Sequence, residues 1–266
     1  MVESTVRDMT KHSRLKVGTF MVEFNTPGIG HILKASGCEL VMVDMEHSGF
    51  SIGDIKQILR YMEAADMPVV LRPPSKEYHH AARALDMGAG AIMFPMVGSP
   101  REVKQLLDYM KYPPQGKRGV ALQIMHDRFA GGPVMKKLRD ANRNTAFCAL
   151  IETLEGVENA DAIASMKDVD LMWIGHFDLS ADMGIAGKFD HPDFEAAIDK
   201  IIKACKKHNK SLGRLVPDAS VGAALFKQGF DFLLHSSDVW MLQTTMTAGI
   251  TELRATCKGG RKRKGR

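Results

Sequence analysis

The chain has 266 residues, of which 45% are hydrophobic and 25% charged, and its formal net charge is +5. These values suit a globular protein with a sizeable core. No apolar run approaches the roughly 18 residues that a membrane helix needs, and the N-terminal segment lacks the apolar stretch of a secretion signal. We therefore expect a cytoplasmic protein without a membrane partner.

The positive charge is concentrated at the C-terminus. Residues 258–266, KGGRKRKGR, carry six basic side chains, and the net charge without them is −1. A short, glycine-flanked basic run is typical of a solvated, disordered tail, and no aromatic residues are interleaved to stack on bases. We expect a single domain over residues 1–257, followed by this tail. Contact of the tail with nucleic acid or an anionic surface is the alternative.

Eight short apolar runs alternate with stretches of helical periodicity. The runs are rich in Val, Ile, Leu and Met, as expected of strands that are buried on both faces. Strands are expected at residues 16–24, 39–44, 68–72, 91–96, 147–152, 170–175, 211–216 and 230–235. Apolar residues at three- and four-residue steps predict helices at residues 52–64, 75–87, 100–112, 192–208 and 219–228. Four glycines lie between a helical stretch and the next expected strand, or at the start of that strand, where they suit helix C-caps or tight turns: Gly37, Gly88, Gly213 and Gly229.

This alternation predicts an α/β protein with a (β/α)8 TIM-barrel fold. An open, doubly wound sheet is the alternative, but it usually carries a glycine-rich phosphate loop after its first strand, and the sequence has none there. Residues 111–144 and 180–192 are connections that fall outside the simple alternation of strands and helices. We expect both segments at the carboxyl ends of the strands, facing a substrate. The four cysteines lie far apart, without a CxxC pair, which indicates free thiols in a reducing compartment.

Charged residues stand where several expected strands end. A parallel barrel brings these ends together on one face. Glu152 and Asp178 directly follow or closely follow apolar runs, where a carboxylate is costly unless it is solvated, paired or metal-bound. Two such carboxylates leave most of an octahedral shell open, which suits Mg²⁺ or Mn²⁺ together with water and a chelating oxyacid. Ion pairs with arginines at the barrel mouth are the alternative.

Arg72 and His47 are candidates for stabilising negative charge and for transferring protons, respectively. Arg72 ends the run PVVLRPP, and its guanidinium could hold a carboxylate or stabilise a developing enolate. A structural ion pair with Asp44 or Glu46 is the alternative for Arg72. His47 is a residue type suited to proton transfer near neutral pH, and Asp86 could supply a carboxylate partner.

Six segments in order carry a resemblance to a known family. They are VDMEH, LRPP, ALDMGAGAIMFPMV, YPPQGKRGV, LIET and IGHFDLSADMG. Over about residues 18–253 the chain resembles the HpcH/HpaI aldolase family of metal-dependent, pyruvate-forming class II aldolases. The resemblance implies a (β/α)8 barrel, usually assembled as a hexamer with exchanged C-terminal helices. A homo-oligomer, trimer or hexamer, is therefore expected.

The resemblance also implies roles for the metal site and Arg72. Glu152 and Asp178 would bind a divalent cation (Mg²⁺, Mn²⁺ or Co²⁺), which chelates the 2-oxo acid through its carboxylate and keto oxygens. Arg72 would hold the keto oxygen and stabilise the enolate. Such Lewis-acid polarisation requires no Schiff-base lysine.

Proton transfer and substrate binding are implied for the remaining candidates. His47, paired with Asp86, would serve the proton transfers at the aldol hydroxyl. Backbone amides around Gly175, His176 and Phe177 would bind the substrate carboxylate. The His176 side chain either touches the site or shapes the loop.

The sequence departs from the family pattern at the pocket. Leu150 stands where a glutamine often helps to bind the 2-oxo acid, and His176-Phe177 replaces the usual Pro-Ala, which should narrow the pocket. The expected activity is cleavage of a 4-hydroxy-2-oxo acid into pyruvate, or a related 2-oxo acid, and an aldehyde. The alternatives are a 3-hydroxyacyl-coenzyme A lyase of the citrate lyase β-subunit group, or a non-catalytic barrel with a polyanion-binding tail.

Overall fold

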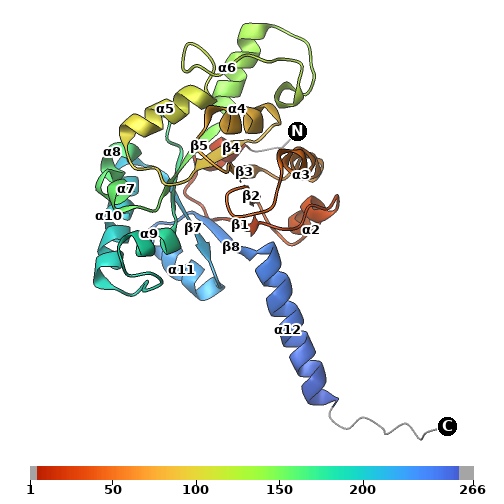
Figure 1. Ribbon diagram of the computed structural model, residues 1–266, viewed down its shortest axis with the longest axis vertical. Coiled ribbons are helices and arrows are strands. Elements are labelled where there is room, and N and C mark those ends of the chain that lie inside the picture. Colours follow the sequence, from red (N-terminus) through yellow and green to blue (C-terminus); the bar gives the residue numbers. More distant parts are fainter. Residues whose placement is uncertain (1–4, 258–266) are drawn as a thin grey trace, which may run out of the picture.

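The computed structural model describes residues 5–257, and its centre is a closed barrel of eight parallel strands in sequential order (Figure 1). Each strand pairs with its neighbours along the chain, and the last strand closes the barrel against the first. The predicted α/β class and (β/α)8 TIM-barrel fold are confirmed. The strands are β1 (Lys16–Met21), β2 (Leu40–Asp44), β3 (Val69–Arg72), β4 (Ala91–Phe94), β5 (Ala146–Ile151), β6 (Leu171–Ile174), β7 (Ser211–Val216) and β8 (Phe232–Ser237).

Helices surround the barrel and connect successive strands (Figure 1). The helices predicted at residues 52–64, 192–208 and 219–228 have those bounds in the structure. The other two predicted helices are shorter than expected. The helices are α1 (Val6–Met9), α2 (Ile29–Ala35), α3 (Ile52–Ala64), α4 (Tyr78–Asp86), α5 (Pro100–Met110), the 3-10 helix η1 (Met125–Asp127), α6 (Val134–Asn144), α7 (Leu154–Glu158), α8 (Ala160–Ala164), α9 (His176–Asp182), α10 (Pro192–His208), α11 (Ala219–Gln228) and α12 (Asp238–Thr256).

Apolar strand residues form two layers, one between the barrel and its helices and one inside the barrel. Trp173 of β6 fills part of the interior beside Gly213 of β7, where an added Cβ would approach Cε3 of the indole to 2.0 Å. The cap or turn predicted at Gly213 is wrong, because this glycine makes room for the indole within a strand. Gly229, in contrast, ends α11 at a φ of 115°, as predicted.

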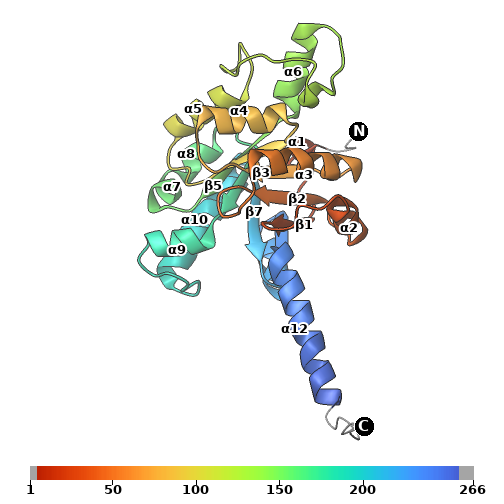
Figure 2. The same ribbon diagram turned by 45° about the vertical axis from the view of Figure 1, so that its right-hand side comes forward.

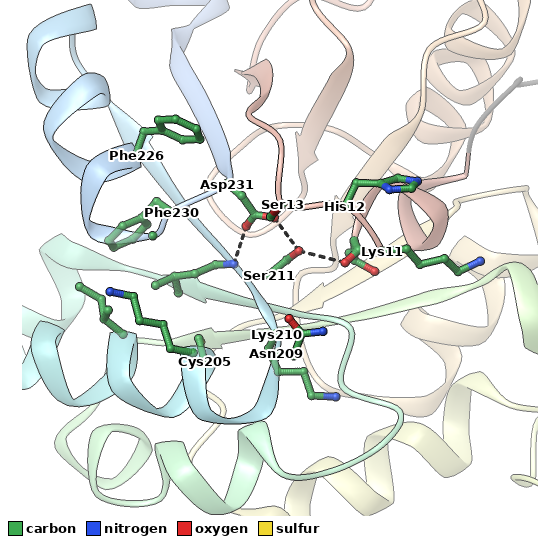
Figure 3. Close-up of a pocket in the computed structure, with 15 residues that line it drawn as sticks. Lys11, His12, Ser13, Cys205, Asn209, Lys210, Ser211, Phe226, Phe230 and Asp231 are labelled. Carbon is green, nitrogen blue, oxygen red and sulfur yellow. Dashed lines mark hydrogen bonds between the residues drawn. The ribbon is translucent and has the colours of Figure 1, made fainter.

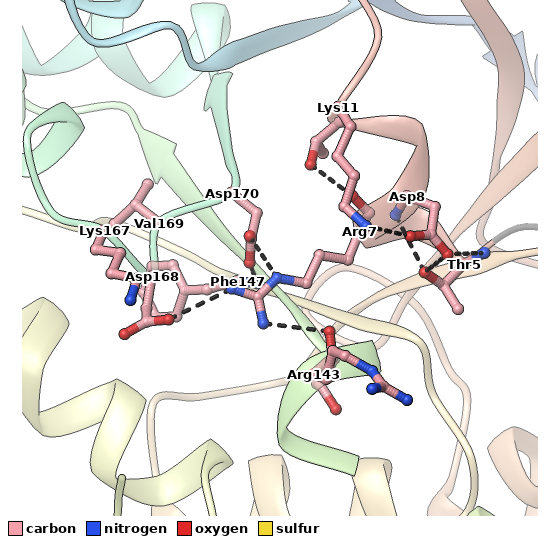
Figure 4. A network of polar contacts seen from close by, with 12 residues as sticks. Thr5, Arg7, Asp8, Lys11, Arg143, Phe147, Lys167, Asp168, Val169 and Asp170 are labelled. Atoms are coloured by element: carbon pink, nitrogen blue, oxygen red, sulfur yellow. Dashed lines mark hydrogen bonds and ion pairs between the residues drawn. The ribbon is translucent and has the colours of Figure 1, made fainter. Parts of the chain in front are cut away.

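Buried polar contacts close the end of the barrel where the strands begin. Asp231 accepts hydrogen bonds from Ser211 Oγ at 2.8 Å and from the backbone N–H of Leu212 at 2.8 Å, beside a pocket of about 350 Å³ (Figure 3). Arg7 of α1 donates through Nε to Asp170 Oδ1 at 2.9 Å, directly before β6 (Figure 4). The Asp231 contacts join the start of β7 to the loop before β8, and the Arg7 contact joins α1 to the loop before β6.

The Lys16–Asp231 ion pair allows a test of how much these buried polar contacts stabilise the fold. Lys16 has no exposed surface, and its Nζ lies 2.6 Å from Asp231 Oδ2. We expect Asp231→Ala to lower the free energy of unfolding by about 3–5 kcal/mol, because it leaves a buried ammonium group without its counter-ion. Urea denaturation followed by circular dichroism measures the loss. Asp199→Ala, which removes an exposed ion pair to Lys203, should change stability by less than about 1 kcal/mol. Equal losses in the two variants would contradict the expectation.

Residues 111–144 lie at the amino ends of the strands, so the expectation that they lie at the carboxyl ends is wrong. This connection leaves the C-terminus of α5 and enters β5 at its first residue. Helix-to-strand connections in such a barrel run at the end opposite to the strand-to-helix loops. Arg118 of this segment donates to Asp86 Oδ1 at 2.5 Å, where α4 ends. The segment between β6 and α10, which includes α9, is a strand-to-helix connection and lies at the carboxyl ends as predicted.

The last helix extends away from the barrel (Figures 1 and 2). It packs against β1 and β8, and large apolar side chains along its length are 39–65% exposed: Trp240, Leu242, Met246, Ile250 and Leu253. Most of the large apolar side chains of α12 are therefore exposed, which is unusual for a helix of a globular domain. The single domain expected over residues 1–257 stays a prediction, and the predicted basic tail lies outside the described residues.

Within residues 5–257, no helix combines the length and the apolar character required to cross a bilayer. The four cysteines are free thiols, with Cys148 and Cys205 buried, Cys38 partly buried and Cys257 exposed.

Candidate active site

Asp44 and Arg72 form a buried, bidentate ion pair at the carboxyl ends of β2 and β3. The strand register places them side by side, and Arg72 Nε and Nη2 donate to the two Asp44 oxygens at 2.6 and 2.9 Å. The same oxygens accept the backbone N–H groups of Glu46 and His47 at 3.1 and 3.0 Å. Burial lowers the pKa of Arg72, but the bonds and charge of Asp44 outweigh it and raise the pKa. Asp44 therefore fixes both the guanidinium and the turn after β2.

Glu46 adds a further carboxylate to this cluster. Its Oε2 lies 3.2 Å from Arg72 Nη1. Burial raises the pKa of Glu46, the positive charge of Arg72 opposes this, and the negative charges of Asp44 and Asp178 add to it. Sequence reasoning considered Glu46 as a partner of Arg72 but missed it as a member of the site. The spacing of two acids in Asp44-Met45-Glu46 was the available signal.

Glu152 directly follows β5 and is 3% exposed. Its Oε1 accepts the backbone N–H of Met96 at 2.6 Å, and Met96 adopts a left-handed conformation with a φ of 49°. Burial raises the pKa of Glu152 to about 7; the Met96 hydrogen bond opposes the shift, and the charge of Asp178 adds to it. A Cβ on Gly175 would lie 2.2 Å from Glu152 Oε2. Gly175 is thus required for the close approach of the β6 exit to this carboxylate.

Asp178 lies in the first turn of α9, directly beyond β6. It is exposed, and among residues 5–257 its carboxylate has no hydrogen bond or ion pair. No side chain caps the N-terminus of α9. Asp178 lies three residues after Gly175, whose backbone packs against Glu152. Its negative charge adds to the effect of burial in raising the pKa of Glu46 and Glu152.

The donor set fits a divalent cation that is bound mainly through carboxylate oxygen. Among residues 5–257, one Glu152 oxygen accepts a backbone N–H, and the Asp178 carboxylate has no hydrogen bond or ion pair. Burial, with a smaller effect of the negative charge of Asp178, raises the pKa of Glu152, and a cation would stabilise the ionised carboxylate. No group of three or more His, Cys, Asp or Glu side chains within the described part of the chain forms a metal cage. The remaining coordination positions would thus fall to water and substrate.

The structure does not bring His47 and Asp86 together. His47 follows β2 at the site, its side chain is 63% exposed, and its Nε2 lies 4.0 Å from Glu46 Oε2. Asp86 ends α4, which runs back along the barrel, so it lies at the opposite end, paired with Arg118. No hydrogen bond or ion pair joins Asp86 to His47 among the residues described. The expected dyad is therefore not formed within one chain.

His176 belongs to an aromatic cluster beside Asp178. Its ring centroid lies 4.5 Å from that of Phe177 and 5.0 Å from that of Phe189. Burial, with a smaller effect of the positive charge of Arg214, lowers the pKa of His176 to about 3. The His176 side chain is thus buried among the rings of this cluster, whereas Phe177 is 58% exposed.

Comparison with known proteins identifies the family of this barrel. The family model described as HpcH/HpaI aldolase/citrate lyase matches residues 17–243. The chain belongs to this family, as the resemblance indicated. It is accordingly an enzyme, a carbon–carbon lyase of the aldolase type.

Similar relatives and structures agree with this assignment. The chain is 33% identical over 225 residues to the hydroxypyruvate/pyruvate aldolase of Paraburkholderia phytofirmans, covering 81% of this chain and 85% of that one. It is 31% identical to the 5-keto-4-deoxy-D-glucarate aldolase of Shigella boydii, covering 80% and 82%. The crystal structure of an HpcH/HpaI aldolase from Desulfitobacterium hafniense superposes with a TM-score of 0.89 at 28% identity, covering 94% and 97%.

Proposed function

We propose that this enzyme uses a divalent cation to cleave a 4-hydroxy-2-oxo acid into pyruvate, or a close relative, and an aldehyde. The observation that carries the proposal is the placement of an open carboxylate, Asp178, beside the buried Glu152 and the fixed guanidinium of Arg72. Small 2-oxo acids are also named for relatives that are about one third identical. The substrates are therefore a 2-oxo acid and an aldehyde.

Glu152 and Asp178 would hold the cation. When bound, it would supply Lewis-acid polarisation of the 2-oxo acid. Arg72 has N–H groups beyond those used by Asp44 and Glu46, and these would donate to the keto oxygen as negative charge develops on it. Because Asp44 holds the guanidinium in a fixed orientation, little reorganisation accompanies that change in charge.

The uncapped first turn of α9 would bind the substrate carboxylate. The Gly175 N–H donates to the Ile151 carbonyl oxygen at 3.2 Å. No side chain of residues 5–257 caps the following N–H groups of His176 and Phe177, and a carboxylate could accept from them. Gly175 also keeps this turn against Glu152. Substrate carboxylate and cation would thus be held by adjacent parts of the same segment.

His47 would exchange a proton with the aldol hydroxyl. Its exposed imidazole follows the turn that Asp44 organises, at the same end of the barrel as Arg72. Glu46 is the carboxylate near it in this chain. Asp86, at the far end of the barrel, can assist His47 only from a neighbouring copy.

We further propose that the chain assembles as a homo-oligomer, either a trimer or a hexamer. The exposed apolar side chains along α12, from Trp240 to Leu253, support burial against a second copy of the chain. The position of Asp86 supports the same conclusion, because its proposed role needs another subunit. Analytical ultracentrifugation measures the assembly directly.

Pyruvate release from a panel of 4-hydroxy-2-oxo acids tests the proposed reaction. We expect activity with Mg²⁺, Mn²⁺ or Co²⁺, loss of at least about 10²-fold after thorough treatment with EDTA, and recovery when a cation is added back. The loss follows because Arg72 alone is left to stabilise the enolate. Activity that survives complete chelation would contradict the role of the cation.

A further inference from the structure

Two exposed apolar residues lie on the segments that flank Glu152, one after β4 and one after β6. Phe177 and Met96 are 58% and 53% exposed, and both are attached to the site by neighbouring polar groups. Phe177 directly precedes Asp178, and the Met96 N–H donates to Glu152 Oε1. Large apolar groups are costly to expose to water, so a ligand that covers these two side chains would be favoured.

The Phe177 ring is held in place rather than free in solvent. It makes an edge-to-face contact with Phe189, with ring centroids 5.1 Å apart and planes at 80°, and its centroid lies 4.5 Å from that of His176. Phe189 in turn contacts Phe194 of α10 at 5.6 Å. Aromatic pairs of this geometry are favourable beyond their buried area. The exposed face of Phe177 is therefore a preformed apolar surface.

Two cations at this end of the barrel, Lys76 and Arg72, already have carboxylate partners. Lys76 Nζ donates to the Met96 carbonyl oxygen at 2.7 Å and forms an ion pair with Glu102. Arg72 is paired with Asp44 and Glu46. A carboxylate at the far end of an aldehyde would lose its water beside Phe177 and Met96 without gaining a free counter-ion from either Lys76 or Arg72, and that loss is costly.

We propose that Phe177 and Met96 select an aldehyde with an alkyl or aryl substituent over one with hydroxyl or carboxylate groups. This inference rests on the proposed aldolase function. In the addition direction, pyruvate C3 loses a proton, a bond forms between C3 and the aldehyde carbon, and the aldehyde oxygen takes up a proton. No oxidant or reductant takes part. The substituent of the aldehyde is the group that would cover the two side chains.

Aldol addition of pyruvate to aldehydes of matched length, measured on the full-length protein with Mg²⁺, tests this selection. Butanal and succinic semialdehyde share a four-carbon chain and differ by a terminal carboxylate. We expect kcat/KM to favour butanal by at least about tenfold. Phe177→Ala and Met96→Ala should each lower this ratio by about tenfold. Because the ratio compares two aldehydes in one variant, a general loss of activity cancels.

Phe226→Ala is the matched control. Phe226 is also a phenyl ring, 43% exposed, but it belongs to α11 and lines the pocket at the opposite end of the barrel (Figure 3). This variant should leave the ratio unchanged. A wild-type preference for succinic semialdehyde, or a ratio that Phe177→Ala does not alter, would overturn the inference.

Exchange of the pyruvate methyl protons with deuterium separates this inference from the function on which it rests. Exchange reports enolate formation and involves no aldehyde. Mg²⁺-dependent exchange without a preference for butanal would overturn the selection by Phe177 and Met96 and leave the aldolase proposal standing. Absence of exchange in the wild-type protein would overturn both.

Discussion

Asp178→Ala should reduce turnover by at least about 10²-fold, to the level that remains after chelation of the wild-type enzyme. The reason is that Asp178 supplies the open carboxylate of the proposed cation site, while Glu152 is already committed at one oxygen to Met96. Asp178 is exposed and has no partner among residues 5–257, so its loss should leave the fold intact. Pyruvate release and circular dichroism measure the two effects.

Asp193→Ala is a suitable control for Asp178→Ala. Asp193 is also a carboxylate in the first turn of a helix, α10, and its side chain is 78% exposed. The control should retain wild-type turnover and the same requirement for a cation. Full activity of Asp178→Ala would remove Asp178 from the cation site.

Arg72→Lys should lower kcat by about 10²–10³-fold, the size expected when one donor to a developing oxyanion is lost. Lysine keeps the positive charge, but it cannot span both Asp44 oxygens and reach Glu46 as the guanidinium does. The charge that compensates the buried Asp44 remains, so the protein should still fold. Steady-state kinetics and urea denaturation distinguish the two effects.

Two further variants sharpen the test of Arg72. Arg72→Ala should also destabilise the fold by about 3–5 kcal/mol, because Asp44 is fully buried and would lose its partner. Arg143→Lys, at an exposed ion pair with Asp140, should leave both kcat and stability near their wild-type values. A wild-type kcat for Arg72→Lys would show that Arg72 is a structural partner of Asp44 only.

The convergence of Arg72, Glu152 and Asp178 at one end of the barrel could be predicted from the sequence. Each residue follows or ends an apolar run, and parallel strands share the end at which they finish. The hydrogen-bond partners of Glu152 and Arg72 could not be predicted in this way. The backbone bond from Met96 to Glu152 and the bidentate bonding of Arg72 by Asp44 depend on contacts between different strands.

The misplaced features have a common physical reason. Asp86 ends a helix and residues 111–144 follow one, and a helix that packs on a parallel strand carries the chain back to the starting end of the barrel. The motifs around Asp86 and in residues 111–144 suggested that both lie near the site. The direction in which the chain runs places them at the opposite end of the barrel instead. The burial of His176 could not be foreseen either, because it depends on Phe189 in a loop thirteen residues further along the chain.

Exchange of the pyruvate methyl protons with deuterium, followed by proton NMR, tests the central claim most directly, because it monitors enolate formation without any choice of aldehyde. The proposed site predicts rapid exchange with Mg²⁺, loss of exchange with EDTA, and recovery when Mg²⁺ is restored. Exchange that is equally fast in the presence of EDTA, or no exchange with any divalent cation, would contradict a cation-assisted enolising site at Glu152, Asp178 and Arg72.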